Sequence, residues 1–165
     1  MTQRFEKAYN ALYKAFMNDT LAKGSCAACA VGNIVADAMG GKVYKRSSGF
    51  EYGCDVFNSW WSDMFYTTKS GQTITTTKEN PNVTDYRKRI KELTGYTWRE
   101  LAKVERVFEK NTKIRHVSYS GCSEKDIMED QFNGLMAVMD VLIELDNIEE
   151  GNKCKETFRN KFALV

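Results

Sequence analysis

Two cysteines separated by two alanines are the residues of this chain with the clearest chemical potential. Cys26 and Cys29 follow Gly24-Ser25 and stand at the predicted start of a helix. Backbone N–H groups and the helix dipole at such a position favour a thiolate, which suits redox exchange. The same spacing lets two sulfur atoms reach one tetrahedral metal ion. A third interpretation is packing alone, because reduced cysteine is among the most buried residue types.

A metal site would need ligands beyond this pair. The chain has one histidine, and its other cysteines are distant in the sequence, so only the fold could bring them to the pair. The apolar composition predicts that the chain folds without a cofactor, and zinc is the ion that would suit these donors. The candidate ligands are Cys26, Cys29, His116 and Cys122, with Cys54 and Cys154 as further cysteines.

The sequence predicts no set of catalytic residues and favours a protein that is not an enzyme. Thioredoxin-like exchange places the CxxC after a strand in a βαβ unit, whereas the segment before Cys26 is predicted to be helix and loop. A nucleophile pair of His116 with Cys26, Cys54 or Cys122 is conceivable. One histidine beside five cysteines arises easily by chance, however.

A second candidate site combines aromatic and basic residues. Trp60 and Trp61 could stack on a base or nicotinamide ring, while Lys45 and Arg46 could bind phosphates. The alternative is that at least one of the tryptophans packs in the core.

Hydrophobic periodicity predicts a mainly α-helical protein, a compact bundle of about five or six helices with one small β-hairpin excursion. The first helix is expected to end near Asn18. Ser25 is the expected N-cap of the second helix, which should stop at Gly40-Gly41. Further helices are predicted over residues 59–65 and 85–94, from the capping box of Thr97 and Glu100 to about Lys110, from Ser123 to Asn147, and over 153–162.

Three segments depart from the helical pattern. Residues 42–57 are rich in Gly, Ser and Tyr and are expected to be loop or short strand. β-Branched residues on both sides of Lys69-Ser70-Gly71 predict a hairpin insertion over about residues 65–80. His116 is expected in an extended loop.

The helix that begins after Ser123 is predicted to be the central buried element, because its apolar stripe is broad. A glycine inside a helix costs about 1 kcal/mol relative to alanine. Gly134 therefore predicts a close contact with a neighbouring backbone, ring or ligand. The alternative is a solvent-facing glycine without such a role.

Composition predicts a single helical domain over residues 1–165. Lys and Arg number 24 and Asp and Glu 22, an excess too small to indicate a nucleic-acid partner for the whole protein. We expect neither a signal peptide nor a membrane span, because no segment approaches the ~18 apolar residues that a span requires. Five cysteines argue against a full disulfide framework and for a reducing cytoplasm. The oligomeric state is left open.

Several short motifs, distributed over most of the chain, resemble a family of small proteins from bacteria and their phages. They are CxxCAVGNI over Cys26 to Ile34, Gly95-Tyr96, Glu100-Leu101, Phe132 to Leu135 and Leu145 to Ile148. The resemblance implies a phage or mobile-element setting in a bacterial host cell and a role for Cys26 and Cys29. It implies no particular activity.

Some members of that family carry the label of the flavin-bearing F subunit of sodium-translocating NADH-quinone reductase. That label would imply a ferredoxin-type cluster with FAD and NADH sites. A plant-type cluster requires a cysteine several residues before the CxxC pair, and residues 3–25 contain none. The chain is also too short to hold a flavin domain and a nicotinamide domain, so we do not apply the label.

Three functional hypotheses follow. The leading one is a non-enzymatic accessory protein that binds a host protein or a small, nucleotide-like ligand and modulates or sequesters it. The rival is a cysteine-dependent redox or metal-binding protein that uses Cys26 and Cys29. A third is a nucleic-acid binder through the basic stretch from Arg87 to Lys113, whose binding would weaken steeply with salt.

Overall fold

The protein is described here by a computed structural model, which covers residues 2–25, 27–46, 49–52, 66–67, 73–74 and 83–163. The described part is mainly α-helical, as predicted. Its α-helices are α1 (Gln3–Met17), α2 (Ala30–Ala38), α4 (Val83–Thr94), α5 (Trp98–Asn111), α6 (Glu124–Asp146) and α7 (Gly151–Phe162). A 3₁₀ helix, η1 (His116–Gly121), joins α5 to α6.

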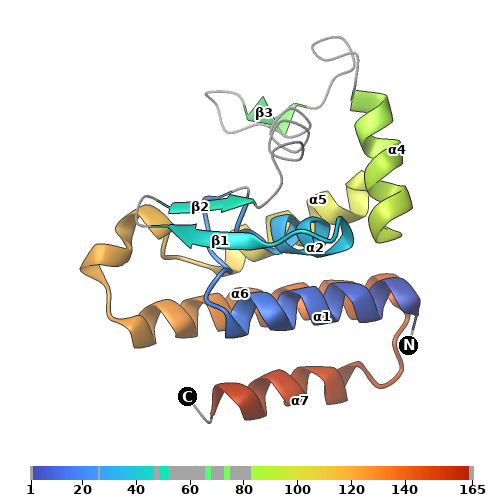
Figure 1. The fold of residues 1–165 in the computed structure, drawn as a ribbon. Coiled ribbons are helices and arrows are strands. Elements are labelled where there is room, and N and C mark those ends of the chain that lie inside the picture. The colour runs from blue at the N-terminus through green and yellow to red at the C-terminus, as the bar shows by residue number, and fades with distance from the viewer. Residues whose placement is uncertain are drawn as a thin grey trace.

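The helices pack in layers around α1 and α6, which lie side by side (Figure 1). α2 and α5 cover one side of this pair, and α7 lies on the opposite side (Figure 1). α4 packs against the α2 and α5 layer. The largest completely buried side chains come from α1, α4, α5, α6, α7 and the adjoining loops: Phe5, Leu12, Leu21, Ile90, Tyr96, Leu101, Phe108, Leu135 and Phe158.

Side-chain caps explain where three of these helices begin. Thr97 and Glu100 form the predicted capping box, in which the Thr97 hydroxyl accepts from the Glu100 N–H and the Glu100 carboxylate accepts from the Thr97 N–H. Ser123 caps α6 by accepting a hydrogen bond from the Asp126 N–H, also as predicted. Thr2 caps α1 in the same way through the Phe5 N–H.

The predicted cap of α2 is wrong. Cys29, and not Ser25, is the N-cap, and its sulfur accepts a hydrogen bond from the Gly32 N–H. Ser25 instead closes the turn before the helix, where its hydroxyl accepts from the Ala28 N–H at 3.4 Å and its carbonyl accepts from the Cys29 N–H at 2.8 Å. The chain therefore makes one separate turn between Ser25 and the first helical residue.

Gly134 lies at the predicted close contact, between α6 and the C-terminal end of α5. A β-carbon added there would lie 2.4 Å from Cγ2 of Thr112 and 2.9 Å from the ring of Phe108. At these distances the added carbon would clash with Thr112 and Phe108, so these side chains would have to move. The missing side chain of Gly134 therefore lets the two helices approach each other.

The described strands form two antiparallel pairs, more than the single hairpin predicted. β1 (Val43–Arg46) pairs with β2 (Gly49–Tyr52), in the segment that we expected to be loop or short strand. β3 (Tyr66–Thr67) pairs with β4 (Thr73–Ile74) inside the predicted insertion over 65–80. Most of that insertion and the predicted helix over 59–65 lie outside the described residues, so they stay predictions. None of the described helices has the length and apolar character needed to cross a membrane.

Candidate functional site

The Cys29 thiol lies at the N-terminus of α2 and is completely buried. Its sulfur accepts a hydrogen bond from the Gly32 N–H, with 3.2 Å between the two heavy atoms. That N–H is one of the first donors of the helix, which have no partner inside the helix. Backbone donors of this kind stabilise negative charge on the group that they face.

Glu105, on α5, brings a carboxyl group to the same place. The carboxyl group accepts hydrogen bonds from the Cys29 thiol and from the backbone of Val31. Its other oxygen, Oε2, is buried and has no hydrogen-bond partner among the described residues. Burial raises the pKa of Glu105 to about 7, and the nearby Glu109 carboxylate adds to the rise. We call Cys29 and Glu105 the thiol–carboxyl pair.

The loop that leads to Cys29 is fixed to the C-terminal end of α5. The Lys23 ammonium donates to the carbonyl oxygens of Glu109 and Thr112, at 2.6 Å each. The Gly24 N–H donates to the Glu109 carboxylate at 3.1 Å, and the His116 N–H donates to the Lys23 carbonyl at 3.1 Å. Gly24 has a φ of 80°, which favours glycine. α5 thus holds both Glu105 and the loop before the thiol.

Asn33, on α2, fixes the same loop from the other side. Its amide nitrogen lies 2.9 to 3.1 Å from the carbonyl oxygens of Thr20, Ala28 and Cys29. Its amide oxygen accepts from the Thr20 hydroxyl at 3.3 Å. Because Asn33 is buried and its polar atoms are engaged, it holds in place the backbone at Thr20 and at the last two residues of the CxxC.

The predicted metal ligands are only partly described. Cys26 lies outside the described residues, as does Cys54. His116 begins the 3₁₀ helix, which corrects the predicted extended loop, and its Nδ1 lies 3.1 Å from the Lys23 carbonyl oxygen. The Cys122 thiol donates to the Ser118 carbonyl at 3.5 Å. Among the described side chains, no three of the His, Cys, Asp and Glu type are grouped so that they could hold a metal. Zinc binding by Cys26, Cys29, His116 and Cys122 stays a prediction.

The predicted aromatic and basic site is described at two of its four positions. Lys45, on β1, forms an ion pair with Asp19. Arg46 occupies the last position of β1, and its side chain is not described. Trp60 and Trp61 lie outside the described residues. Their grouping into a ligand site therefore stays a prediction.

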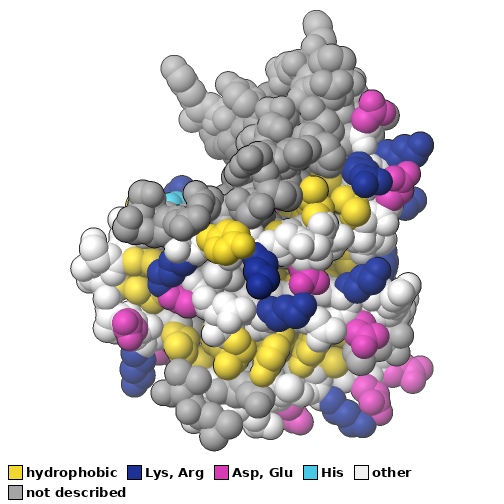
Figure 2. Space-filling view, viewed as in Figure 1, with side chains coloured by type: hydrophobic (Ala, Val, Ile, Leu, Met, Phe, Trp, Pro, Cys, Tyr) yellow, Lys and Arg dark blue, Asp and Glu magenta, His cyan; other side chains and the backbone are white. Residues whose placement is uncertain are grey.

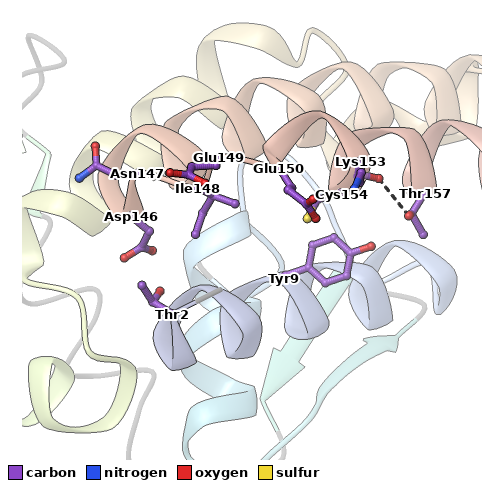
Figure 3. A pocket seen from close by; sticks show the side chains of 10 residues that line it. All are labelled: Thr2, Tyr9, Asp146, Asn147, Ile148, Glu149, Glu150, Lys153, Cys154 and Thr157. Carbon is purple, nitrogen blue, oxygen red and sulfur yellow. Dashed lines mark hydrogen bonds and ion pairs between the residues drawn. The ribbon is translucent and has the colours of Figure 1, made fainter.

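An open recess of about 730 Å³ lies between α1 and α7. In Figure 3 the Tyr9 ring of α1 points toward Cys154 and Thr157 of α7. Burial raises the pKa of both the Tyr9 phenol and the Cys154 thiol. Figure 2 shows a row of hydrophobic side chains on the face where α1 and α7 lie. No sequence signal pointed to this recess.

A second, partly buried polar cluster joins the start of α1 to the end of α6. Arg4 donates to Asp146 at 2.5 Å and to Glu100 at 3.1 Å, and its guanidinium lies 4.4 Å from the centre of the Tyr96 ring. The Tyr96 hydroxyl donates to the second Asp146 oxygen at 2.5 Å. We call Arg4, Tyr96, Glu100 and Asp146 the Arg4 clasp. Both carboxylates of the clasp accept hydrogen bonds from donors within it, and we therefore assign it a structural role.

Glu105 is the site residue that sequence analysis missed, although a signal for it exists. It follows Leu101 by four residues and precedes Phe108 by three, which places it on the same helix face as these buried side chains. A carboxyl group on an apolar helix face must be protonated, paired or hydrogen-bonded. Comparison of the chain with protein-family models, curated proteins and solved structures gives no match.

Proposed function

We propose that the protein is a cysteine-dependent redox protein in which Cys29 and Cys26 cycle between two thiols and one disulfide. The observation that supports this proposal is the position of the Cys29 sulfur between the Gly32 N–H and the Glu105 carboxyl group. The first group stabilises a thiolate, and the second can accept the thiol proton. Capping of α2 accounts for the Gly32 contact, whereas packing alone would not call for the Glu105 carboxyl group. The spacing of the two cysteines in the sequence supplies the partner sulfur.

The burial of Cys29 sets the order of the steps. An external disulfide, on a protein or on a small thiol compound, reacts first with the Cys26 thiolate, because Cys29 is completely buried. This step forms a mixed disulfide and releases one half of the external disulfide as a thiolate. The Cys29 thiolate then attacks the Cys26 sulfur and displaces the second half. The protein loses two electrons and two protons, and the external disulfide becomes two thiols.

The test is to equilibrate the reduced protein with oxidised glutathione and to locate disulfides by alkylation and peptide mass spectrometry. We expect a Cys26–Cys29 disulfide that dithiothreitol reverses. Cys29→Ser should stop at a stable mixed disulfide between Cys26 and glutathione. The serine hydroxyl can still accept from Gly32 and donate to Glu105, so this variant should fold.

Cys122→Ser and Cys154→Ser are the matched controls and should form the disulfide as the wild type does. The proposal would be overturned if Cys26 and Cys29 of the wild type stay reduced at equilibrium and Cys29→Ser forms no mixed disulfide. Stoichiometric zinc in protein purified without a chelator, lost in Cys26→Ser, would support the metal-binding alternative instead.

The accessory-protein hypothesis remains the second candidate, and the recess between α1 and α7 is the observation that favours it. A recess of about 730 Å³ is large enough for a small ligand, and the Tyr9 ring offers a stacking surface. A melting temperature that rises with added ATP or NAD in the wild type, but not in Tyr9→Ala, would support ligand binding there. Equal melting temperatures with and without these nucleotides would count against it.

A further inference from the structure

Basic side chains form a row on the outer side of α5. They recur at steps of four, three and four residues, which places them above one another along one face of the helix. The buried residues of α5, Leu101, Val104 and Phe108, lie on the opposite face. The row extends about 16 Å, because a helix rises about 1.5 Å per residue. We call it the α5 basic stripe, and its members are Arg99, Lys103, Arg106 and Lys110.

The acidic residues of α5 are directed away from this stripe. Glu100 belongs to the Arg4 clasp, and Glu105 belongs to the thiol–carboxyl pair. Glu109 accepts a hydrogen bond from the Gly24 N–H at 3.1 Å. Each acid of the helix therefore contacts another element. Within the described part of the chain, none of the three forms an ion pair with a member of the stripe.

The helix α6 is acidic and packs on α5, so its carboxylates are the next candidates to neutralise the stripe. Glu144 does so at one position, where it pairs with Lys103 at 3.0 Å. Other acids of α6 bind a lysine of α7, the clasp, or backbone N–H groups after α5: Asp140, Asp146 and Asp130. Among the described residues, the other three members of the stripe pair with no carboxylate.

Three exposed cations without an acidic partner therefore lie on one face of α5: Arg99, Arg106 and Lys110. Arg106 and Lys110 are four residues apart, a spacing at which like charges destabilise a helix. A row of anions bound along the stripe would remove this repulsion. The excess of two positive charges over the whole chain does not indicate such a surface, because the compensating acids lie elsewhere on the molecule.

We propose that the α5 basic stripe binds the phosphate backbone of duplex DNA without reading its sequence. The inference goes beyond the proposed redox function and does not depend on it. Each strand of a duplex carries one phosphate per about 3.4 Å of its axis. A length of about 16 Å then presents about five phosphates per strand, enough for one at each cation of the stripe. The fork of an arginine guanidinium also matches the oxygens of a phosphate.

The shape and surroundings of the stripe favour a DNA duplex over other polyanions. Proteins that bind single strands stack bases on open aromatic rings. Trp98, next to Arg99, is half-buried, and the Arg87 guanidinium lies over its ring at 4.0 Å from the centre. A straight, rigid row of charges fits the regular phosphates of a duplex. The major groove of B-DNA admits a helix, whereas that of duplex RNA is deep and narrow.

The test measures binding of the full chain, kept reduced with dithiothreitol, to a fluorescent DNA duplex of about 20 base pairs by fluorescence polarisation. Between about 50 and 200 mM salt, the logarithm of the affinity should fall with that of the salt concentration with a slope of about −3. Arg106→Gln should weaken binding roughly tenfold at low salt and make the slope shallower by about 1, since it removes one phosphate contact.

Arg159→Gln is the matched control, because Arg159 is an exposed arginine of α7, on the opposite side of the α1 and α6 pair (Figure 1). It should bind the duplex as the wild type does. Circular dichroism checks that both variants are folded. Equal weakening in Arg106→Gln and Arg159→Gln would overturn the proposal, because binding would then follow total charge. Absence of duplex binding by the wild type at low salt would overturn it as well.

Other polyanions test the choice of partner. We expect the DNA duplex to bind more tightly than a single DNA strand or an RNA duplex of the same sequence. We also expect polyglutamate, added at an equal concentration of charge, to leave the DNA bound. Tighter binding of the single strand or of RNA would overturn the assignment to duplex DNA. Displacement of the DNA by polyglutamate would overturn it in favour of an acidic protein partner.

Discussion

The Arg4 clasp and the thiol–carboxyl pair each place acids among packed helices, but they differ in how these acids are satisfied. In the clasp, Asp146 has only 2% of its side chain exposed and accepts from both Arg4 and Tyr96. In the thiol–carboxyl pair, Glu105 faces a weak thiol donor and one backbone group, and one of its oxygens has no partner among the described residues.

The difference separates a structural role from a chemical one. In the clasp both oxygens of the Asp146 carboxylate have a donor, and removing one partner of such a pair leaves a buried charge without compensation. Burial without a neighbouring cation instead raises the pKa of Glu105, to about 7. Burial alone therefore does not identify the candidate site. The incomplete pairing of Glu105 does.

Breaking the clasp should give the largest effect. Arg4→Met leaves Asp146 buried without its cation and should lower the free energy of unfolding by about 3 to 5 kcal/mol. The low end is the better expectation, because 27% of the Arg4 side chain is exposed. Urea unfolding followed by circular dichroism measures the change.

The matched control for this prediction is Lys103→Met, which removes the exposed ion pair with Glu144. It should cost less than about 1 kcal/mol, because surface ion pairs contribute little. Equal losses of unfolding free energy in the two variants would show that the clasp stabilises the fold no more than a surface ion pair does. Cys26–Cys29 disulfide formation in the folded Arg4→Met protein should be unchanged.

The pH dependence of stability that Glu105 causes should be the next largest effect. Its sign is opposite to that of an acid paired with a cation, because the pKa of Glu105 is raised and not lowered. The pKa of Glu105 is raised from 4.5 to about 7. Between these values the folded protein holds a proton that the unfolded chain has released, so stability falls as the pH rises through this window. The loss is up to about 3 kcal/mol and is complete above the folded-state value.

The difference between the wild type and Glu105→Gln isolates this contribution, because other groups titrate equally in both proteins. Glu105→Gln should gain stability relative to the wild type as the pH rises from acid to neutral. Glu129→Gln, an exposed position on α6, serves as the control and should follow the wild type. Parallel stability curves for the wild type and Glu105→Gln would contradict the raised pKa.

Local signals account for the parts of the fold that the sequence could predict. The capping box of Thr97 and Glu100 and the cap at Ser123 involve residues three positions apart, and both were found from spacing alone. The cap of α2 was missed because Ser25 and Cys29 both lie near the helix start. Serine is the stronger cap by propensity, but the turn after Ser25 leaves Cys29 at the capping position.

The candidate site depends on contacts that no local pattern encodes. Cys29 was singled out by its motif, whereas its partner Glu105 comes from a different helix and was missed. The clasp is a clearer case, since Arg4 and Asp146 are 142 positions apart. An acid on an apolar helix face is a usable signal that some partner exists. Which partner it is depends on how α2 and α5 pack.

The smallest of the expected effects comes from Gly134, which lies against Phe108 and Thr112 at the C-terminal end of α5. An added methyl group would lie 2.4 Å from Thr112 Cγ2, so Gly134→Ala should destabilise by about 1 to 3 kcal/mol despite the better helix propensity of alanine. Thr112 also accepts from Lys23, so its displacement should reach the loop before Cys29. Amide NMR shifts should therefore change at Lys23 and Gly24 and stay constant at Tyr96, which lies in the clasp.

Gly121→Ala is the control, because a β-carbon there meets no atom within 4 Å. A raised melting temperature for Gly134→Ala would refute the close contact, and equal shifts at Tyr96 and Gly24 would show that the two clusters are not independent.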